Sequence, residues 1–331
     1  MDNPILFHVG YHKTGTTWMQ HMLFTPRNGY APAMTHHQAF QTLVRPSTFT
    51  FDPAPARRLI ARAGAGRAVV SSEILVGNPF HGGRESDVYA RRIAQVAPDA
   101  RILITIREQH AAIASTYMQY LNRGGTLPVD AFLSGSSVPG YFGFDAEHFC
   151  YARLVALYHD LFGADHVLVL THEALVAHPQ RTAARIAAFA GLGAAPFAAR
   201  QRVAASYPEA AAFLLRRVNH LRAAPAAPEP VVDLGAPASL AYRAVGWAAA
   251  RPGLRHLIGR HKPVRAVVRA RFAGRFVQSN QALAGLLGGA ADLTGYEGIE
   301  RAPAAPVARR GRDSAPASAR HPAGALQEGP A

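Results

Sequence analysis

The sequence predicts an α/β protein, a three-layer sandwich in which helices cover both faces of a central parallel sheet. Four short apolar runs indicate buried strands, and longer amphipathic stretches that indicate helices separate them. Buried strands that alternate with helices are typical of a parallel sheet, because each crossover helix lies on one of its faces. The predicted strands are 5–10, 67–72, 101–106 and 166–171.

The predicted helices fill the intervals between these strands and follow them. The first strand ends at Gly10 and a loop, after which apolar residues return at helical spacing. The expected helices are 18–24, 86–97, 109–122, 147–162 and 180–190. Strands and helices together predict a core over residues 5–192.

The pattern weakens beyond residue 192. Residues 223–237 are rich in Ala and Pro, which indicates a linker or a long loop. Residues 240–275 are basic and predicted to be helical, with breaks at Pro252 and Pro263 because proline interrupts a helix.

An apolar rhythm returns over 276–296, whereas 301–331 consist mainly of Ala, Pro and Arg and indicate a disordered tail. We therefore predict a single domain over 1–300. Its parts are the core, a variable basic helical region at 216–275 and a C-terminal core segment at 276–296.

Composition indicates a globular protein, since 49% of the residues are hydrophobic and 17% are charged. The single cysteine, Cys150, excludes an internal disulfide and fits a reducing compartment. The run 5–10 is too short for a signal peptide core, and arginines or prolines interrupt each later apolar window. We expect a cytoplasmic protein without a transmembrane segment.

The net charge of +14 is concentrated in one part of the chain. Residues 216–275 contain 11 arginines and one lysine against Glu229 and Asp233, a net charge of +10. Either an anionic ligand or surface binds near this region, or its arginines form a solvated face.

The segment Gly10–Trp18 has the arrangement of a phosphate-binding loop. A strand that leads through glycine into a helix presents free backbone N–H groups and the positive end of the helix dipole to an anion. Thr16 and Thr17 add hydroxyl donors, and Lys13 adds a mobile cation.

The same loop differs from that of a nucleoside triphosphatase. Gly10 and Gly15 have P-loop spacing, but Thr16 follows the second glycine, where those enzymes need lysine. Instead Lys13 lies within the loop. Only this residue and Lys262 are lysines among 35 basic residues, which indicates a chemical need for an ammonium here.

A second candidate phosphate site follows the strand 101–106. Arg107 comes directly after it, and Ser115 lies about two helical turns further on. Both can face the crevice at the carboxyl edge of the sheet, where open α/β folds bind ligands. An arginine with a hydroxyl is a suitable receptor for a phosphate monoester.

The residues HKTGTTW resemble the 5'-phosphosulfate loop of the sulfotransferase family, which has lysine, serine or threonine, glycine, two threonines and tryptophan in that order. The resemblance implies a P-loop-like fold with a helical insertion on the acceptor side, and a donor that is 3'-phosphoadenylyl sulfate (PAPS). It also implies that Lys13 contacts the leaving phosphosulfate and that Trp18 packs on adenine. The residues implied to hold the 5'-phosphate are Thr14, Gly15, Thr16 and Thr17.

The spacing of Arg107 and Ser115 resembles the 3'-phosphate signature of the same family, with Tyr117 as the nearby aromatic residue. The family often has asparagine and proline after the arginine, and this chain has Glu108 and Gln109 instead. Two phosphate sites for one nucleotide imply selectivity for the 3'-phosphorylated donor over ATP.

A base for the acceptor proton is expected at the end of the second predicted strand. Glu73 lies there, at the same sheet edge as the loop. Many carbohydrate-acting and bacterial members of the family have glutamate at this place, whereas cytosolic small-molecule enzymes have histidine, so the resemblance favours Glu73 over His12 or His81. No metal site is expected, because the histidines lack partners at ligand spacing.

The expected activity is therefore transfer of a sulfuryl group to a hydroxyl or amine of an unidentified acceptor, for which carbohydrates and glycolipids are the candidate classes. One interpretation of the basic region is that it binds an anionic polysaccharide or a lipid headgroup, the latter with peripheral membrane contact. We expect no nucleic-acid partner.

Two alternative functions remain. One alternative is a P-loop kinase or triphosphatase, which the missing lysine and the lack of a clear Walker B carboxylate disfavour. The other is a non-catalytic nucleotide- or glycan-binding module.

Overall fold

A computed structural model of the chain describes residues 4–135, 142–193, 207–223, 234–253, 256 and 260–300. Residues Met1–Glu300 form one compact unit. The tail expected at 301–331 lies outside the described residues, as does most of the linker expected at 223–237.

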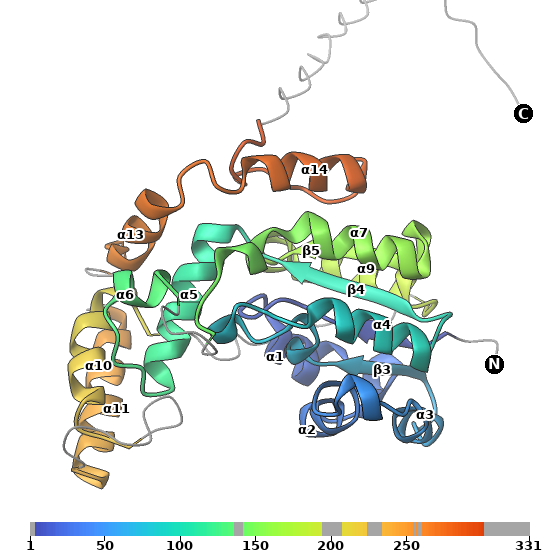
Figure 1. Cartoon of the computed structure of the whole chain (residues 1–331), viewed down its shortest axis with the longest axis horizontal. Coiled ribbons are helices and arrows are strands. Elements are labelled where there is room, and N and C mark those ends of the chain that lie inside the picture. The colour runs from blue at the N-terminus through green and yellow to red at the C-terminus, as the bar shows by residue number, and fades with distance from the viewer. Residues whose placement is uncertain are drawn as a thin grey trace, which may run out of the picture. The chain divides into compact units, whose positions relative to one another are not determined.

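The central sheet has five parallel strands in the order β2-β3-β1-β4-β5 (Figure 1). β1 lies in its middle, and Phe7 pairs with Val70 on one side and with Ile102 on the other. The strands are β1 Leu6–His8, β2 Tyr30–Met34, β3 Arg67–Ser71, β4 Arg101–Ile106 and β5 Val167–Thr171.

The four predicted strands are confirmed, and β2 was missed. Its sequence, YAPAM, contains Pro32 and two alanines in place of the β-branched residues that mark a strand. Proline is tolerated because β2 is an edge strand, where one row of N–H groups needs no partner within the sheet.

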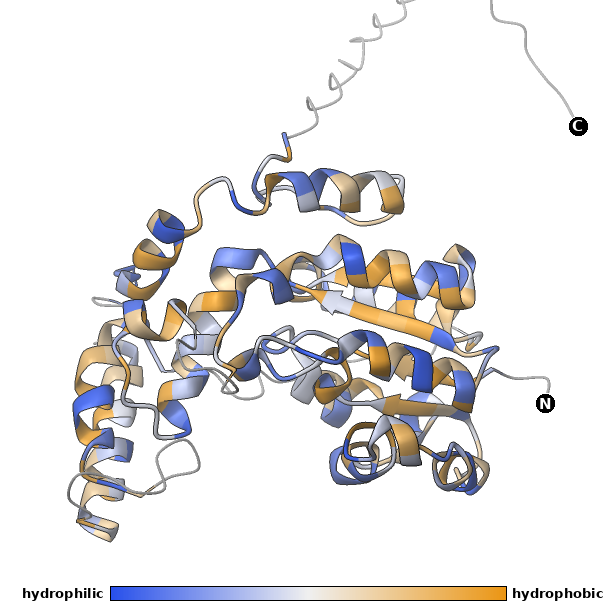
Figure 2. Ribbon diagram, in the orientation of Figure 1, coloured by the Kyte–Doolittle hydropathy of each residue, from blue (hydrophilic) through white to orange (hydrophobic). Residues whose placement is uncertain are grey.

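Alternate strand residues enter two separate cores, so the sheet is covered on both faces. Phe7 of β1 packs with Ile93 of α4 and Val155 of α7, whereas the adjacent Leu6 packs with residues of α8 and α9 on the other face. Figure 2 shows β3 and β4 mainly in the hydrophobic colour, as expected for strands buried on both faces. The predicted three-layer α/β architecture is therefore confirmed.

The helices of the core agree with the sequence pattern, apart from the first. The expected helix at 18–24 is a short α-helix, α1, that continues as a π-helix, η1. The predicted helices correspond to α4 Ser86–Val96, α5 Gln109–Asn122, α7 Tyr151–Phe162 and α9 Pro179–Phe189. The others are α1 Thr16–Trp18, η1 Met19–Leu23, α2 His36–Ala39, α3 Ala54–Ala61, α6 Val129–Leu133 and α8 His172–Ala177.

Short helical turns connect these elements. They are η2 Pro26–Asn28, η3 Phe40–Val44, η4 Thr48–Thr50, η5 Glu73–Val76, η6 Pro79–His81, η7 Ala146–Phe149, η8 Ala164–His166 and η9 Glu209–Ala211. The one that matters for the site is η5, because it begins directly after β3.

The C-terminal part packs on helices of the core. α10 and α13 lie against α5, and α14 lies against α7. Pro252 follows the end of α11 and Pro263 begins α13, as predicted from the sequence. These helices are α10 Ala212–Asn219, α11 Ala236–Ala250, α13 Pro263–Arg271 and α14 Val277–Leu287. In the described part of the chain, no helix combines the length and the apolarity needed to cross a bilayer.

Candidate active site

Four strands deliver candidate site residues to one edge of the sheet. Because all five strands are parallel, their carboxyl ends lie at the same edge, and ligands of open α/β folds bind there. The loop 9–15 follows β1, Glu73 follows β3, Arg107 follows β4 and His172 follows β5.

A chain of buried hydrogen bonds fixes the loop after β1. His8 reaches Ser71 of β3 through Nδ1, at 2.8 Å from Oγ, and Thr105 of β4 through Nε2, at 3.1 Å from Oγ1. The Thr105 hydroxyl lies 2.8 Å from that of Thr14, which donates to the carbonyl of Tyr11 at 2.5 Å. Burial lowers the pKa of His8 to about 3, so the ring is neutral and can donate at one nitrogen and accept at the other.

This chain of contacts changes the role of Thr14. The resemblance implied that Thr14 helps to hold the 5'-phosphate, but its side chain is fully buried and its hydroxyl is engaged within the loop. Its side chain therefore shapes the loop, and only its backbone amide is left for a ligand.

The two loop glycines are required by close contacts. A Cβ at Gly10 would collide with the side chains of His8 and Thr105. Gly15 adopts φ of 97° immediately before α1, and a Cβ there would lie 2.8 Å from Leu175 of α8. The loop thus approaches both β4 and α8 more closely than any other residue type would allow.

The residues after Gly15 differ in their exposure. The Thr16 side chain is buried, and its Oγ1 has no hydrogen-bond partner within the described structure. An oxygen atom of a ligand could accept the hydrogen bond that this hydroxyl is able to donate. Thr17 is exposed. Trp18 is half-buried and packs against the core formed with α8 and α9, which leaves part of the ring accessible.

Lys13, Arg107 and Glu73 meet at this edge, as the sequence predicts. Arg107 donates from Nη1 to the carbonyl oxygen of Lys13 at 3.2 Å. Burial and the Arg107 charge lower the pKa of Lys13, while the Glu73 carboxylate raises it. The three charges are therefore close enough to influence one another, although β1, β3 and β4 supply them separately.

Glu73 is well placed for proton transfer. It is the first residue of η5, half-buried, and its carboxylate accepts no hydrogen bond from the residues that the structure describes. Its free oxygens and its proximity to Lys13 are suited to a base beside a leaving group.

The two histidines considered as alternatives are placed differently. His12 is buried next to Lys13, and burial together with the nearby His148 and Arg123 lowers its pKa to about 3, which makes it a weak base. His81 is exposed, with Nδ1 at 3.1 Å from the carbonyl oxygen of Phe142. Glu73 remains the better candidate.

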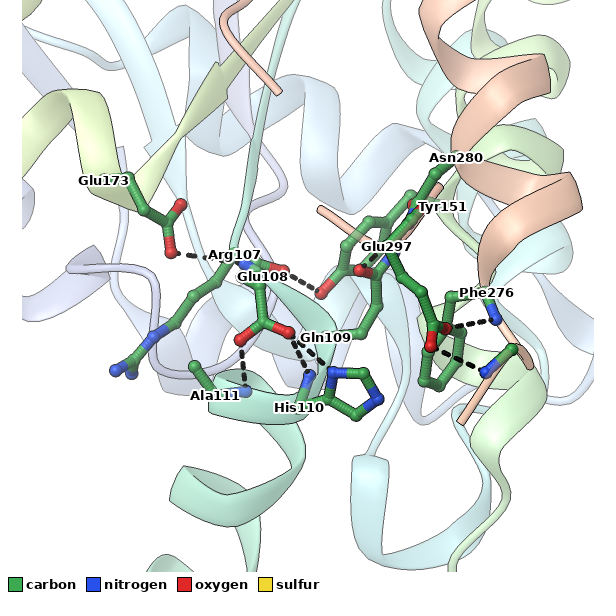
Figure 3. Close-up of polar contacts among 11 residues, drawn as sticks. Arg107, Glu108, Gln109, His110, Ala111, Tyr151, Glu173, Phe276, Asn280 and Glu297 are labelled. Carbon is green, nitrogen blue, oxygen red and sulfur yellow. Dashed lines mark hydrogen bonds and ion pairs between the residues drawn. The ribbon is translucent and has the colours of Figure 1, made fainter. Parts of the chain in front are cut away.

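The departure from the family pattern after Arg107 has a structural explanation. Glu108 caps α5, since its carboxylate accepts the backbone N–H groups of His110 at 3.0 Å and Ala111 at 2.9 Å (Figure 3). Burial alone would raise the pKa of Glu108, but the hydrogen bonds from the His110 ring and from these N–H groups together outweigh burial and lower the pKa. The turn after β4 is therefore ordered by a charged N-cap.

A cavity of about 480 Å³ opens beside Arg107. Its lining includes Ala111, His172, Glu173 and Arg265. Ser115 is half-buried on the same face of α5 as Ala111, one turn further along, but is not part of the lining. Tyr117 is buried and donates its hydroxyl to the carbonyl of Leu127 at 3.0 Å, so it belongs to the core.

Arg265 is a site residue that the sequence did not single out. It comes from α13, far along the chain, and its charge contributes to lowering the pKa of Arg107, which burial lowers most. The Nε atoms of both arginines are buried without a hydrogen-bond partner in the described part of the chain. Two such guanidinium groups beside one cavity are suited to bind a dianion.

His172 was also missed. Burial, and then the charges of Arg107 and Lys13, lower its pKa to about 4, so the ring is neutral. Its Nδ1 is buried and has no partner among the described residues. The only sequence signal for it was its position directly after a strand.

The C-terminal segment is attached to the turn after β4. Gln109 donates to Asn280 of α14 at 2.5 Å, and Tyr151 donates to the carbonyl of Arg107 at 2.6 Å (Figure 3). Glu297 accepts the backbone N–H of Phe276 at 3.2 Å. These contacts attach α14 and the segment after it to the turn after β4, and Thr294 and Gly295 of that segment line the cavity. Within the described ranges, no three His, Cys, Asp or Glu side chains come together in a way that would hold a metal ion.

Comparison with known proteins identifies the segment that contains the second phosphate site. Residues 85–196 match the sequence profile of the sulfotransferase family. Over this segment, which is less than half of the chain, the sequence is similar to that family. The sulfotransferase match includes Arg107 and Ser115, whereas Lys13 and Glu73 precede it. It confirms the resemblance that the motifs indicated and supports sulfuryl transfer as the activity.

Two solved sulfotransferase structures are similar to this chain at low identity. The sulfotransferase from Alicyclobacillus acidocaldarius is 20% identical over 61% of this chain and 87% of its own, with a TM-score of 0.48. Mouse sulfotransferase SULT7A1 complexed with PAP is 15% identical over 81% of this chain and 88% of its own, with a TM-score of 0.37. No curated protein matches the chain significantly.

Proposed function

We propose that this protein is a sulfotransferase that moves the sulfuryl group of PAPS to a hydroxyl or amine of an acceptor. The observation that carries the proposal is the meeting of Lys13, Arg107 and Glu73 at the carboxyl edge of the sheet. A cation for the leaving group, an anion receptor and a base are the groups that this reaction needs.

The donor's two phosphate groups would occupy opposite sides of Arg107. The backbone amides from Thr14 to Thr17 and the free Thr16 hydroxyl would hold the 5'-phosphate at the start of α1. Arg107 and Arg265 would hold the 3'-phosphate, with Ser115 one turn beyond the cavity. Trp18 supplies a partly exposed ring for the adenine.

The reaction is a single displacement at sulfur. The acceptor gives its proton to the Glu73 carboxylate while its oxygen or nitrogen forms the new bond to sulfur. The bond from sulfur to the bridging oxygen breaks, and its electron pair stays on the leaving phosphate. The ammonium of Lys13, held in a partly buried place, stabilises the charge that develops on this oxygen.

Three features of the site disfavour ATP hydrolysis or phosphoryl transfer from ATP. Thr16 follows Gly15 where a triphosphatase has lysine, so the loop lacks the cation that reaches β- and γ-phosphates. Thr14 and His8 hold the loop rigidly through buried hydrogen bonds. The cavity beside Arg107 provides a separate dianion site that ATP would not use.

A transfer assay tests the proposal. Purified protein is incubated with sulfur-radiolabelled PAPS and a panel of phenols, amines, oligosaccharides and glycolipids, and in parallel with ATP labelled on the γ-phosphate. We expect label to appear on at least one acceptor from PAPS and none from ATP. Magnesium-dependent transfer from ATP alone would contradict the proposal.

A further inference from the structure

Two adjacent helices outside the site carry large apolar side chains in solvent. α10 and α11 pack on each other (Figure 1), and α11 turns Tyr242 and Gly246 inward, where Gly246 lies against the ring of Tyr207. On the outward side Leu240 is 62% exposed and Trp247 59% exposed. Phe213 and Leu214 of α10 are 56% and 53% exposed.

Arginines are interleaved with these apolar residues. On α11 the positions 240, 243 and 247 lie on one helix face, and Arg243 is exposed between Leu240 and Trp247. Arg251, just beyond the helix, stacks on Trp247 with Cζ 3.7 Å from the ring centre. On α10 Arg217 stacks on Phe213 at 4.5 Å.

In the described part of this basic segment, positive charge is in large excess. In the described residues between 212 and 275 there are arginines and one lysine but no Asp or Glu. A surface with such an excess of arginine attracts polyanions.

The apolar residues decide which polyanion fits. Four large apolar side chains exposed by more than half are unexpected on a surface that only faces water. A sulfated glycan presents mainly polar groups, which offer no apolar contact for leucine. An anionic bilayer accepts both components, because Trp and Leu enter the interface while arginines meet the phosphate groups.

We propose that the outward surface of α10 and α11 docks on an anionic phospholipid bilayer. Leu240, Trp247, Phe213 and Leu214 would enter the headgroup region, and Arg217, Arg243 and Arg251 would contact lipid phosphates. The surface is tied to the end of α5, where Arg222 donates to the carbonyl of Asn122 at 3.3 Å. The adjacent Arg123 is one of the charges that lower the pKa of His12 in the site loop.

Vesicle co-sedimentation of the full chain tests this proposal. Wild-type protein is mixed with vesicles of phosphatidylcholine alone or with about 30% phosphatidylglycerol. We expect binding only to the anionic vesicles. Leu240→Ser with Trp247→Ser should weaken it about 10-fold, and Arg243→Glu with Arg251→Glu at least about 5-fold per arginine.

Matched control residues come from the N-terminal part of the chain, outside α10 and α11. Phe49 in η4 is fully exposed, and Arg58 and Arg62 are exposed on α3. Phe49→Ser, and Arg58→Glu with Arg62→Glu, should bind anionic vesicles like wild type. Equal losses in the controls and the surface variants would assign binding to net charge and overturn the proposal.

A second measurement does not depend on altering the surface. In a Trp18→Phe background, Trp247 is the remaining tryptophan, and brominated phospholipid in the vesicles should quench its emission. Unquenched emission, or absence of wild-type binding to anionic vesicles, would overturn the proposal. If the protein bound heparin but not anionic vesicles, the surface would be assigned to an anionic glycan, and the proposal would be overturned.

Discussion

The site loop and the α10–α11 surface both concentrate positive charge, but in opposite ways. Lys13 and Arg107 are largely withdrawn from water, contact each other through a hydrogen bond to backbone, and come from different strands. Arg217 and Arg251 are exposed and stack on aromatic rings of their own segment. A few desolvated cations suit one small dianionic ligand, whereas many solvated cations suit an extended surface.

Arg265 connects the two regions. It belongs to the basic segment by sequence, yet its side chain lines the cavity beside Arg107. The basic segment thus contributes one arginine to the cavity of the proposed binding site and others to the proposed docking surface. Substitutions in each region should therefore affect different measurements.

The largest effect is expected for Glu73→Gln. Loss of the base should lower the transfer rate by a factor on the order of 10² to 10⁴. Affinity for adenosine 3',5'-bisphosphate, measured by calorimetry, should stay within about twofold of wild type, since a base contributes little to donor binding. Loss of nucleotide affinity in a folded variant would contradict the assigned role.

Lys13→Ala should cost about 3 kcal/mol of transition-state stabilisation, by analogy with removal of an oxyanion donor. The rate of sulfuryl transfer would then fall on the order of 100-fold, with an unchanged melting temperature. Lys262→Ala is the matched control, because Lys262 is the other lysine of the chain and is exposed, directly before α13. A wild-type rate in Lys13→Ala would remove the ammonium from the mechanism.

Arg107→Ala and Arg265→Ala test whether these two arginines, unlike those of the α10–α11 surface, bind the 3'-phosphate. Each should weaken binding of adenosine 3',5'-bisphosphate about 10-fold or more, because a charge-assisted contact is lost, while leaving the affinity for AMP nearly unchanged. Arg243→Ala on the surface should change neither affinity. Equal losses for the bisphosphate and AMP would place these arginines outside the 3'-phosphate site.

A further prediction concerns stability in acid rather than activity. His8, His12, His148 and His172 have pKa values lowered to between about 3 and about 4, so they stay neutral when folded and bind protons when unfolded. Their contribution is complete above the unfolded value near 6.5 and is lost as the pH falls through the folded values, which are about 4 for His172 and about 3 for the other three.

Each such histidine contributes a slope of up to about 1.4 kcal/mol per pH unit in that window. Urea unfolding of His148→Phe between these pH values should give a slope smaller by this amount than wild type, whereas the exposed His81→Phe should not. An unchanged slope in His148→Phe would show that this ring is protonated in the folded protein.

Much of the fold could be predicted because local patterns determine it. Apolar runs and helical periodicity gave β4, α4 and α5 within a residue, since β4 is an almost continuously buried apolar run and the two helices repeat apolar residues at helical spacing. β2 could not be predicted, because Pro32 is tolerated there only by virtue of its edge position, which the sequence does not reveal.

The site was predictable where a residue follows a strand. Lys13, Glu73 and Arg107 could be expected at one edge because parallel strands end there. The roles of His8 and Arg265 could not, since they depend on contacts between segments far apart in the chain.

Calorimetry with three nucleotides shows whether the protein has separate sites for a 5'-phosphate and a 3'-phosphate. Wild-type protein should bind adenosine 3',5'-bisphosphate at least about 10-fold more tightly than AMP or ATP, because only that ligand fills both the loop after β1 and the cavity beside Arg107. Equal affinity for the three nucleotides, or tighter binding of ATP, would contradict the account.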